Sequence, residues 1–359
     1  MDARWMALAF SLGRRGMGRV WPNPAVGCVI VKEGRVIGRG WTQDGGRPHA
    51  EVVALAQAGA AAHGADVYVS LEPCAHTGET GPCASALISA GVARVITALK
   101  DPDTRVAGRG LSMLREAGIA VVEDVLAPQA RRDHAGFLSR IEAGRPMVTL
   151  KLAMSLDGRI ATAAGESQWI TGPEARRVVH AMRARHDAVL VGAGTARADA
   201  PSLTVRDLGV DRQPVRVVMS AALDLPQSGP LFETARDVPV WLLHGTDAPS
   251  DRVAAWSRAG AELILFDSGR DARGALQSLG ARGLTRVFCE GGGQLAASLL
   301  QADCVDRLVV MQAGMVLGGD ARAGIGALSL QALSLAERFV FCQQRAVGPD
   351  VMQVWARGS

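Results

Sequence analysis

Residues 49–83 contain three short motifs, His49-Ala50-Glu51, Leu71-Glu72-Pro73-Cys74 and Gly81-Pro82-Cys83. One imidazole and two thiolates are soft ligands of the kind that zinc takes in proteins. Three protein ligands leave the fourth position open, which is the arrangement of a catalytic rather than a structural zinc site. The stretch therefore predicts that His49, Cys74 and Cys83 hold one zinc ion per chain.

Glu51 lies two residues from His49 and is the candidate catalytic residue. Zinc lowers the pKa of a bound water towards neutrality, and a nearby carboxylate can take and return its protons. A His-x-Glu followed by Pro-Cys and a second Cys is the signature of zinc deaminases, in which the Glu is not a ligand. Eight residues separate Cys74 from Cys83, and this loop still allows both thiols to reach one metal.

Two plainer interpretations stand beside the catalytic zinc site. The six cysteines of the chain could be small buried hydrophobic side chains. A closed structural zinc site could instead take His76 as its fourth ligand. The three motifs together favour the catalytic interpretation, in which His76 faces substrate or solvent.

Length and composition indicate a soluble protein of two α/β domains. At 359 residues the chain is long enough for two cores, with 48% hydrophobic and 21% charged residues. No apolar run is long enough to span a membrane, and residues 1–10 alternate charged and apolar residues unlike a signal peptide. Thiolate ligands favour a reducing compartment, so we expect a cytoplasmic protein. The net charge of +4 is spread along the chain without a basic stripe, which argues against a nucleic-acid partner.

The first 145 residues alternate strand and helix patterns. Two apolar runs around Lys32-Glu33-Gly34-Arg35 predict a hairpin. Helices are expected at 3–16, from His49 to Ala62, at 84–90 and near 111–117, and strands at 67–71, 95–98 and 119–122. This alternation predicts a mixed or parallel sheet covered by helices. His49 and Glu51 can face one site only at the start of their helix, because residues two apart in mid-helix point to nearly opposite faces.

Four motifs carry a resemblance to a known family: Asn23-Pro24-Ala25-Val26-Gly27, Pro48-His49-Ala50-Glu51, Leu71-Glu72-Pro73-Cys74 and Gly108-Arg109-Gly110. Together they resemble the deaminase half of the bifunctional riboflavin-biosynthesis deaminase/reductase family. The resemblance implies a cytidine-deaminase-like three-layer α/β/α fold, zinc on His49, Cys74 and Cys83, proton transfer by Glu51 and a base contact from Asn23. The chain has Glu79 where the family commonly has a basic residue, and Asp103-Thr104 where it has Asn-Pro.

A new domain begins after Gly144-Arg145-Pro146, so the predicted domains are residues 1–145 and 146–359. Strands are expected at 147–153, 188–191, 215–219, 240–243, 263–266 and 287–289, with antiparallel edge strands at 308–312, 339–343 and 351–355. Glycine clusters follow two of these strands, at Gly192–Gly194 and Gly291–Gly293. Each is a tight turn or a phosphate-binding helix start, and neither is the full dinucleotide motif.

The second domain resembles the reductase half of the same family, which is similar in fold to dihydrofolate reductase and uses NADPH. The matching motifs include Leu156-Asp157-Gly158, Gln168-Trp169-Ile170-Thr171 and Glu290-Gly291-Gly292. The resemblance places on the cofactor Ala153, Trp169, Thr195, Asp199, Ser220, Gly292, Gly293, Gln294, Leu295, Ala296, Ala297 and Ser298. It places on the substrate Ser167, Arg183, Leu203, Arg206 and Glu290. Lys151 and Asp199 are the candidate proton donors.

The predicted function is deamination of a phosphorylated pyrimidine followed by NADPH reduction of its ribosyl chain, in a homo-oligomer. Two alternatives stay open: a deaminase of free or nucleic-acid bases with an inert second domain, and a zinc-stabilised binding protein. Metal removal separates them, because losing a structural zinc unfolds a domain whereas losing a catalytic zinc mainly abolishes turnover.

Overall fold

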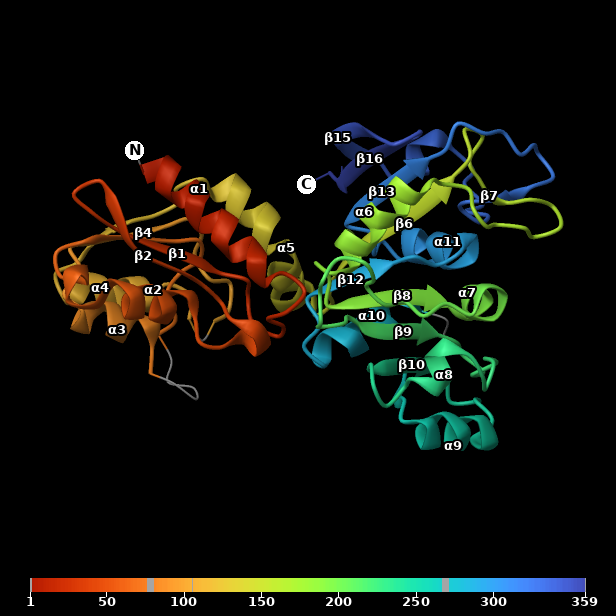
Figure 1. Cartoon of the computed structure of the whole chain (residues 1–359), viewed down its shortest axis with the longest axis horizontal. Coiled ribbons are helices and arrows are strands. Elements are labelled where there is room, and N and C mark those ends of the chain that lie inside the picture. Colours follow the sequence, from red (N-terminus) through yellow and green to blue (C-terminus); the bar gives the residue numbers. More distant parts are fainter. Residues whose placement is uncertain (1, 76–80, 105, 267–270, 359) are drawn as a thin grey trace. The chain divides into compact units, whose positions relative to one another are not determined.

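The structure is a computed structural model that describes residues 2–75, 81–104, 106–266 and 271–358. The chain divides into two compact units, Met1–Gly144 and Arg145–Ser359, each with its own sheet (Figure 1). The division falls one residue before the boundary expected from the sequence. The expectations for His76 and Glu79 concern residues outside the described part of the chain.

The first unit is built on a five-stranded sheet in the order β2-β1-β3-β4-β5. The predicted hairpin forms from two antiparallel strands, and the three strands after it run parallel to one another. The bounds are β1 Gly27–Lys32, β2 Arg35–Trp41, β3 Asp66–Val69, β4 Arg94–Thr97 and β5 Ala120–Val122. Apart from Lys32, the residues of β1 are all buried, as expected for a strand covered on both faces.

Helices cover both faces of this sheet, with α1 and α5 on one side and α2, α3 and α4 on the other (Figure 1). Their bounds are α1 Asp2–Gly13, α2 Ala50–Ala58, α3 Cys83–Ser89, α4 Arg109–Glu116 and α5 Ala127–Ala143. Two glycines of the sheet allow the backbones of its strands to pack closely against those of the covering helices. A Cβ on Gly27 of β1 would lie 1.8 Å from the Ala9 carbonyl of α1, and one on Gly40 of β2 would lie 2.2 Å from the Ala50 carbonyl of α2. The expected three-layer α/β/α arrangement is confirmed.

The second unit is built on a nine-stranded sheet in the order β11-β10-β9-β8-β12-β6-β13-β16-β15. The strands are β6 Met147–Met154, β8 Ala188–Gly192, β9 Val215–Met219, β10 Val240–His244, β11 Glu262–Leu265, β12 Arg286–Cys289, β13 Arg307–Gln312, β15 Phe339–Val347 and β16 Asp350–Arg357. The antiparallel strands expected at the end of the chain form, since β16 pairs antiparallel with both β13 and β15. Strand β13 is not an edge strand as expected, because it also runs parallel to β6; the edge strands of this sheet are β15 and β11.

Helices and short elements complete the second unit: α6 Pro173–Arg183, α7 Ala193–Asp199, α8 Pro230–Glu233, α9 Ser250–Ala259, α10 Ala272–Ala281 and α11 Gly293–Gln301, with the small β7 Arg159–Ala161 and β14 Arg322–Ala323 sheet. One core joins Val189 and Val191 of β8 to Trp256 of α9. Another joins Val179 of α6 to Phe288 of β12. The resulting α/β architecture agrees with the fold class expected from the sequence.

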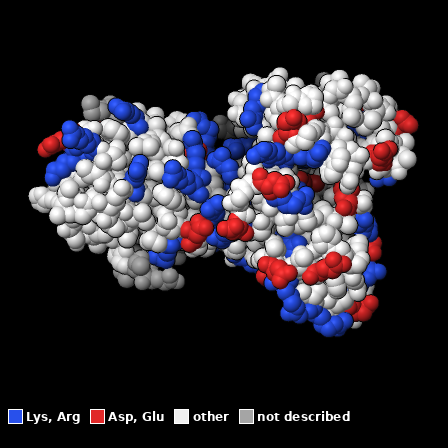
Figure 2. All heavy atoms as spheres, in the orientation of Figure 1, with Lys and Arg blue, Asp and Glu red and all other residues white. Residues whose placement is uncertain are grey.

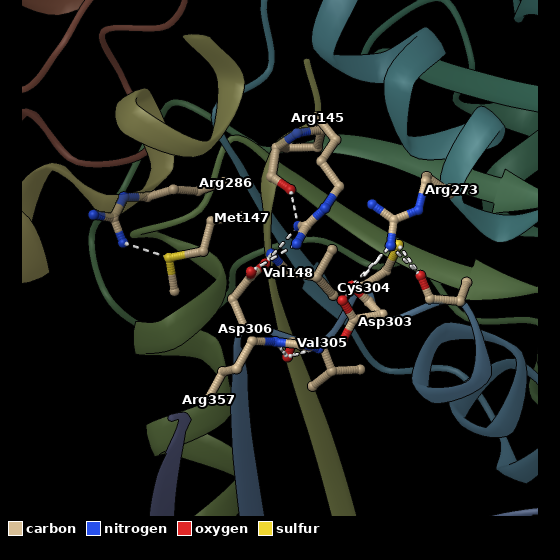
Figure 3. Close-up of polar contacts among 12 residues, drawn as sticks. Arg145, Met147, Val148, Arg273, Arg286, Asp303, Cys304, Val305, Asp306 and Arg357 are labelled. Atoms are coloured by element: carbon tan, nitrogen blue, oxygen red, sulfur yellow. Dashed lines mark hydrogen bonds and ion pairs between the residues drawn. The ribbon is translucent and has the colours of Figure 1, made fainter. Parts of the chain in front are cut away.

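The second unit begins at a buried ion pair (Figure 3). Arg145 donates from Nη1 and Nη2 to the two carboxylate oxygens of Asp306, at 2.7 and 2.8 Å. The same carboxylate accepts the Val148 N–H at 2.7 Å. Arg145 is 8% exposed, so Asp306 fixes the start of β6 against the start of β13.

Candidate active sites

The three predicted zinc ligands converge in the first unit. The His49 Nδ1 lies 3.7 Å from the Cys74 Sγ and 3.3 Å from the Cys83 Sγ, and all three ligand atoms lie within 4.8 Å of one another. Tetrahedral zinc, with bonds of about 2.3 Å to sulfur and 2.0 Å to nitrogen, sets its ligands about 3.5–3.8 Å apart. The two nitrogen–sulfur distances lie at or close to this range, so the cluster can accommodate a zinc ion.

Local structure orients each of the three side chains toward the cluster. His49 is the N-cap of α2 with an extended backbone, so Glu51 in the first turn faces the same site. Cys83 is the first residue of α3, and its backbone N–H donates to the Cys74 Sγ at 3.3 Å. A thiolate near a helix amino terminus is favoured by the free N–H groups there. Cys74 follows β3 and is fixed by tertiary contacts.

The thiols of the cluster compete for one negative charge. Hydrogen bonds from Cys83 and His49 lower the pKa of Cys74 to about 4, although burial opposes the shift. The hydrogen bond to Cys74, together with burial, raises the pKa of Cys83. A divalent cation placed between them would allow both thiols to ionise. One imidazole and two thiols arranged in this way fit zinc.

Glu51 is buried beside the cluster, with 4% of its surface exposed. Burial raises the pKa of Glu51 to about 7, with the His49 imidazole acting in the opposite direction. A carboxyl group that titrates near neutrality can both accept and return a proton, as general acid–base catalysis requires. Asn23 contacts the segment that leads to His49, since its Nδ2 donates to the Gly46 carbonyl at 3.2 Å.

The predicted cofactor residues of the second unit gather at one edge of its sheet. Strands β9, β8, β12 and β6 are parallel neighbours, and ligands of open α/β sheets bind beyond the carboxyl ends of such strands. The predicted residues lie there: Ala153 near the end of β6, Thr195 after β8, Ser220 after β9 and Gly292 after β12.

The two glycine turns are joined by a hydrogen bond. The Gly292 N–H donates to the Thr195 Oγ1 at 3.1 Å, which sets the start of α7 beside the start of α11. The latter holds the other predicted residues, Gly293–Ser298. At the end of α7, burial raises the pKa of Asp199, and a hydrogen bond from Ser167 acts in the opposite direction. Trp169 is 65% exposed, with the Arg176 guanidinium 4.5 Å from its ring.

Arg183 and Glu290, both expected on the substrate, are paired with each other. Arg183 donates from Nε and Nη2 to the two carboxylate oxygens of Glu290, at 2.5 and 3.1 Å, and from Nη1 to the Thr204 carbonyl at 2.8 Å. Burial lowers the pKa of Lys151 beside this pair, and Glu290 acts in the opposite direction. Arg183 is therefore held between Glu290 and the Thr204 carbonyl, whereas Arg206 is exposed.

Two residues at these sites were given no role from the sequence. His180 on α6 accepts the Arg206 backbone N–H at 3.2 Å through Nδ1. It precedes Arg183 by three positions, a spacing that places two helical residues on one face. Glu72 is buried two positions before Cys74. Its place directly after an apolar run is the sequence signal, because a buried carboxylate needs hydrogen-bond partners.

Comparisons with known proteins match both units. Residues 1–99 match the cytidine and deoxycytidylate deaminase zinc-binding region, and residues 146–352 match the RibD C-terminal domain. The riboflavin biosynthesis protein RibD of Escherichia coli strain K12 is 41% identical over 98% of both chains. The chain belongs to the RibD family.

Solved RibD structures agree over both units of this family member. Acinetobacter baumannii RibD, form 1, is 36% identical with a TM-score of 0.90, covering 100% of this chain and 99% of that one. A Thermotoga maritima structure named as a diaminohydroxyphosphoribosylaminopyrimidine deaminase/5-amino-6-(5-phosphoribosylamino)uracil reductase is 32% identical with a TM-score of 0.87, at the same coverage. This RibD-family chain is thus a bifunctional enzyme of riboflavin biosynthesis, a deaminase and a reductase. Among its described helices, none is both long and apolar enough to cross a membrane.

Proposed function

We propose that residues 1–145 deaminate a diaminopyrimidinone ribotide with zinc, and that residues 146–359 then use NADPH to reduce its ribosyl group to a ribityl chain. One observation carries the proposal: a three-ligand cluster of His49, Cys74 and Cys83 adjoins the buried Glu51, in a chain whose other unit matches the RibD C-terminal domain. The name of the Thermotoga maritima relative supports the same substrate class.

In the deaminase site, the protein supplies proton transfer and orientation. When bound, zinc would supply a water activated for attack at neutral pH. The Glu51 carboxylate would accept a proton from that water and return it to the exocyclic amine, so that the ring carbon gains oxygen and ammonia leaves. Asn23, anchored on the Gly46 carbonyl, would hold the base. His49, Cys74 and Cys83 would occupy three positions on the metal and leave the fourth for the reaction.

In the reductase site, the protein supplies binding and a proton. When bound, NADPH would supply the hydride, and the protein would orient it. The first N–H groups of α11, from Gly293 to Leu295, would hold a cofactor phosphate, since a helix amino terminus is an anion site. Arg206 would meet the substrate phosphate through charge-assisted hydrogen bonds. Lys151, beside Glu290, and Asp199 are the candidate proton donors.

The chain is further proposed to form a homo-oligomer through the edge of its second sheet that β15 forms. Most of β15 is exposed, including Val340 and Phe341 at 59% and 53%, and Leu333 and Leu335 nearby in sequence are 87% and 63% exposed. An exposed edge strand with large apolar side chains is a surface that proteins usually cover. A second copy of the chain is the occupant that we propose.

A small-molecule substrate and a cytoplasmic location complete the proposal. None of the six cysteines forms a disulfide, which supports a reducing compartment. On the face drawn in Figure 2, basic side chains of the second unit alternate with acidic ones. In the second unit, this mixture supports a small phosphorylated substrate over a nucleic acid, which needs a continuous basic surface.

Mass spectrometry of the diaminopyrimidinone ribotide after incubation with the enzyme tests the proposal. Without NADPH, the expected product has an amine replaced by oxygen, and with NADPH it gains two hydrogens. Metal analysis should give one zinc per chain. Exchange of the amine alone would contradict the reductase assignment. An unchanged substrate in the presence of zinc and NADPH would favour a zinc-stabilised binding protein.

A further inference from the structure

Glu72 is a buried carboxylate that, among the described residues, accepts its hydrogen bonds from backbone N–H groups between positions 101 and 111. It is 4% exposed. Its Oε2 accepts the N–H groups of Asp101 at 3.1 Å and Gly108 at 2.9 Å. Its Oε1 accepts those of Gly110 at 3.0 Å and Leu111 at 3.5 Å. Such donors offset the cost of burying a charge, so this carboxylate holds the turn at residue 101 and the start of α4 together.

The main chain beside Glu72 leads directly to a zinc ligand. Glu72 is joined through Pro73 to Cys74, and its own N–H donates to the Leu99 carbonyl at 2.9 Å. Gly110 packs on the next peptide, because a Cβ there would lie 2.0 Å from the Pro73 carbonyl oxygen. Proline fixes its own φ and restricts the residue before it. A shift of Glu72 would therefore be transmitted to Cys74 with little room for compensation.

Cys74 has a second anchor on its other side. Its carbonyl accepts the Ala84 N–H at 3.2 Å, and its Sγ accepts the Cys83 N–H at 3.3 Å. Both donors belong to the first turn of α3. Cys74 itself lies in no helix or strand, so its position depends on α3 on one side and on the contact between Glu72 and α4 on the other.

We propose that Glu72 is a positioning residue of the deaminase site: its carboxylate holds the Pro73-Cys74 peptide against α4, and so sets the Cys74 Sγ beside His49 and Cys83, where it would hold the metal. The inference rests on the proposed zinc site. It assigns no proton transfer and no ligand role to Glu72. A residue that only stabilised the fold would lower the unfolding temperature without changing how the folded protein binds zinc.

Glu72→Gln is the direct test, because it keeps the shape and replaces one acceptor oxygen by an NH2 group that would face two backbone N–H donors. Glu116→Gln, on the exposed face of α4, is the matched control. Zinc affinity is measured by competition with a chelator, and ligand geometry by the absorption spectrum of the cobalt-substituted protein. Loss of outer partners of a metal site typically costs about 10- to 100-fold in affinity. We expect a loss in that range for Glu72→Gln, an altered cobalt spectrum and unchanged reductase activity.

Two measurements keep the proposal testable if Glu72→Gln does not fold. Gly110→Ala presses on the Pro73 carbonyl without changing charge, and should also weaken zinc binding. In the wild-type protein, stripping zinc with a chelator should speed hydrogen exchange at the amides of residues 108–111 more than in α5.

The proposal is overturned if Glu72→Gln binds zinc as tightly as the wild type with the same cobalt spectrum, whatever its unfolding temperature. If that variant does not fold, either of two results overturns the proposal. One is that Gly110→Ala binds zinc as tightly as the wild type. The other is that removing zinc does not change the rate of hydrogen exchange at the amides of residues 108–111. A wild-type protein that binds no zinc or does not deaminate would instead contradict the proposed function. The two failures are therefore distinguishable.

Discussion

The pairing of Arg183 with Glu290 makes a prediction that separates two roles for this arginine. Replacing either partner should impair reduction and spare deamination, because the pair belongs to the second unit. The two side chains are 12% and 11% exposed. Breaking a buried pair by removing one partner costs about 3–5 kcal/mol. If most of this free energy is lost from transition-state stabilisation, kcat/KM for reduction should drop by about 10²–10³-fold, since each tenfold change corresponds to about 1.4 kcal/mol.

The assay follows loss of NADPH absorbance with the deaminated substrate supplied directly. Glu290→Gln, Arg183→Gln and the double variant form a cycle, and ammonia release from the deaminase substrate is the control in each preparation. If Arg183 acts through Glu290, the double variant should be little worse than the worse single variant, since partners in one network are not additive.

Additive losses would refute this reasoning. They would show that Arg183 contributes independently of Glu290, for example by binding the substrate phosphate itself. In that case Arg183→Gln should raise KM for the phosphorylated substrate far more than for the dephosphorylated one. Arg206→Gln is expected to show this behaviour, because its exposed guanidinium is the cation that we assign to the phosphate.

Three further predictions concern the buried charges. Glu51→Gln should lower the deamination rate by at least about 10²-fold while zinc content and reduction stay unchanged; retained deamination would contradict its proton-transfer role. Burial lowers the pKa of His186 to about 3 from 6.5, so the folded state binds fewer protons than the unfolded state between these values. This histidine therefore lowers stability as pH falls through that window, and His186→Gln should flatten the pH dependence in urea unfolding. Asp306→Asn should destabilise the second unit by about 3 kcal/mol, because the Arg145 guanidinium loses its carboxylate counter-charge (Figure 3); an unchanged unfolding temperature would contradict this.

The chemistry of the first site was predictable because its ligands lie in short motifs. His49 and Glu51 are near neighbours at a helix start, and each cysteine follows a proline, so residue type and spacing alone indicated a three-ligand zinc site. The strand and helix pattern was likewise local, since periods of two and 3.6 residues can be recognised within a single segment. Only the structure shows that His49, Cys74 and Cys83 converge in space.

Long-range pairing decided the rest. The order of the strands placed β13 inside the sheet, and no pattern within residues 307–312 distinguishes an inner strand from an edge strand. Arg183 and Glu290 are 107 residues apart, so only the fold shows that two residues expected on the substrate neutralise each other. The role of Glu72 likewise depends on backbone N–H groups that lie up to 39 positions away.

The sequence by itself determined the α/β class, the candidate zinc ligands and the two-part organisation, because these follow from local periodicity and from the chemistry of neighbouring residues. The tertiary structure decided which buried charges are paired and which backbone segments hold them. A buried charge is stable only with partners, and those partners come from parts of the chain that folding alone brings together.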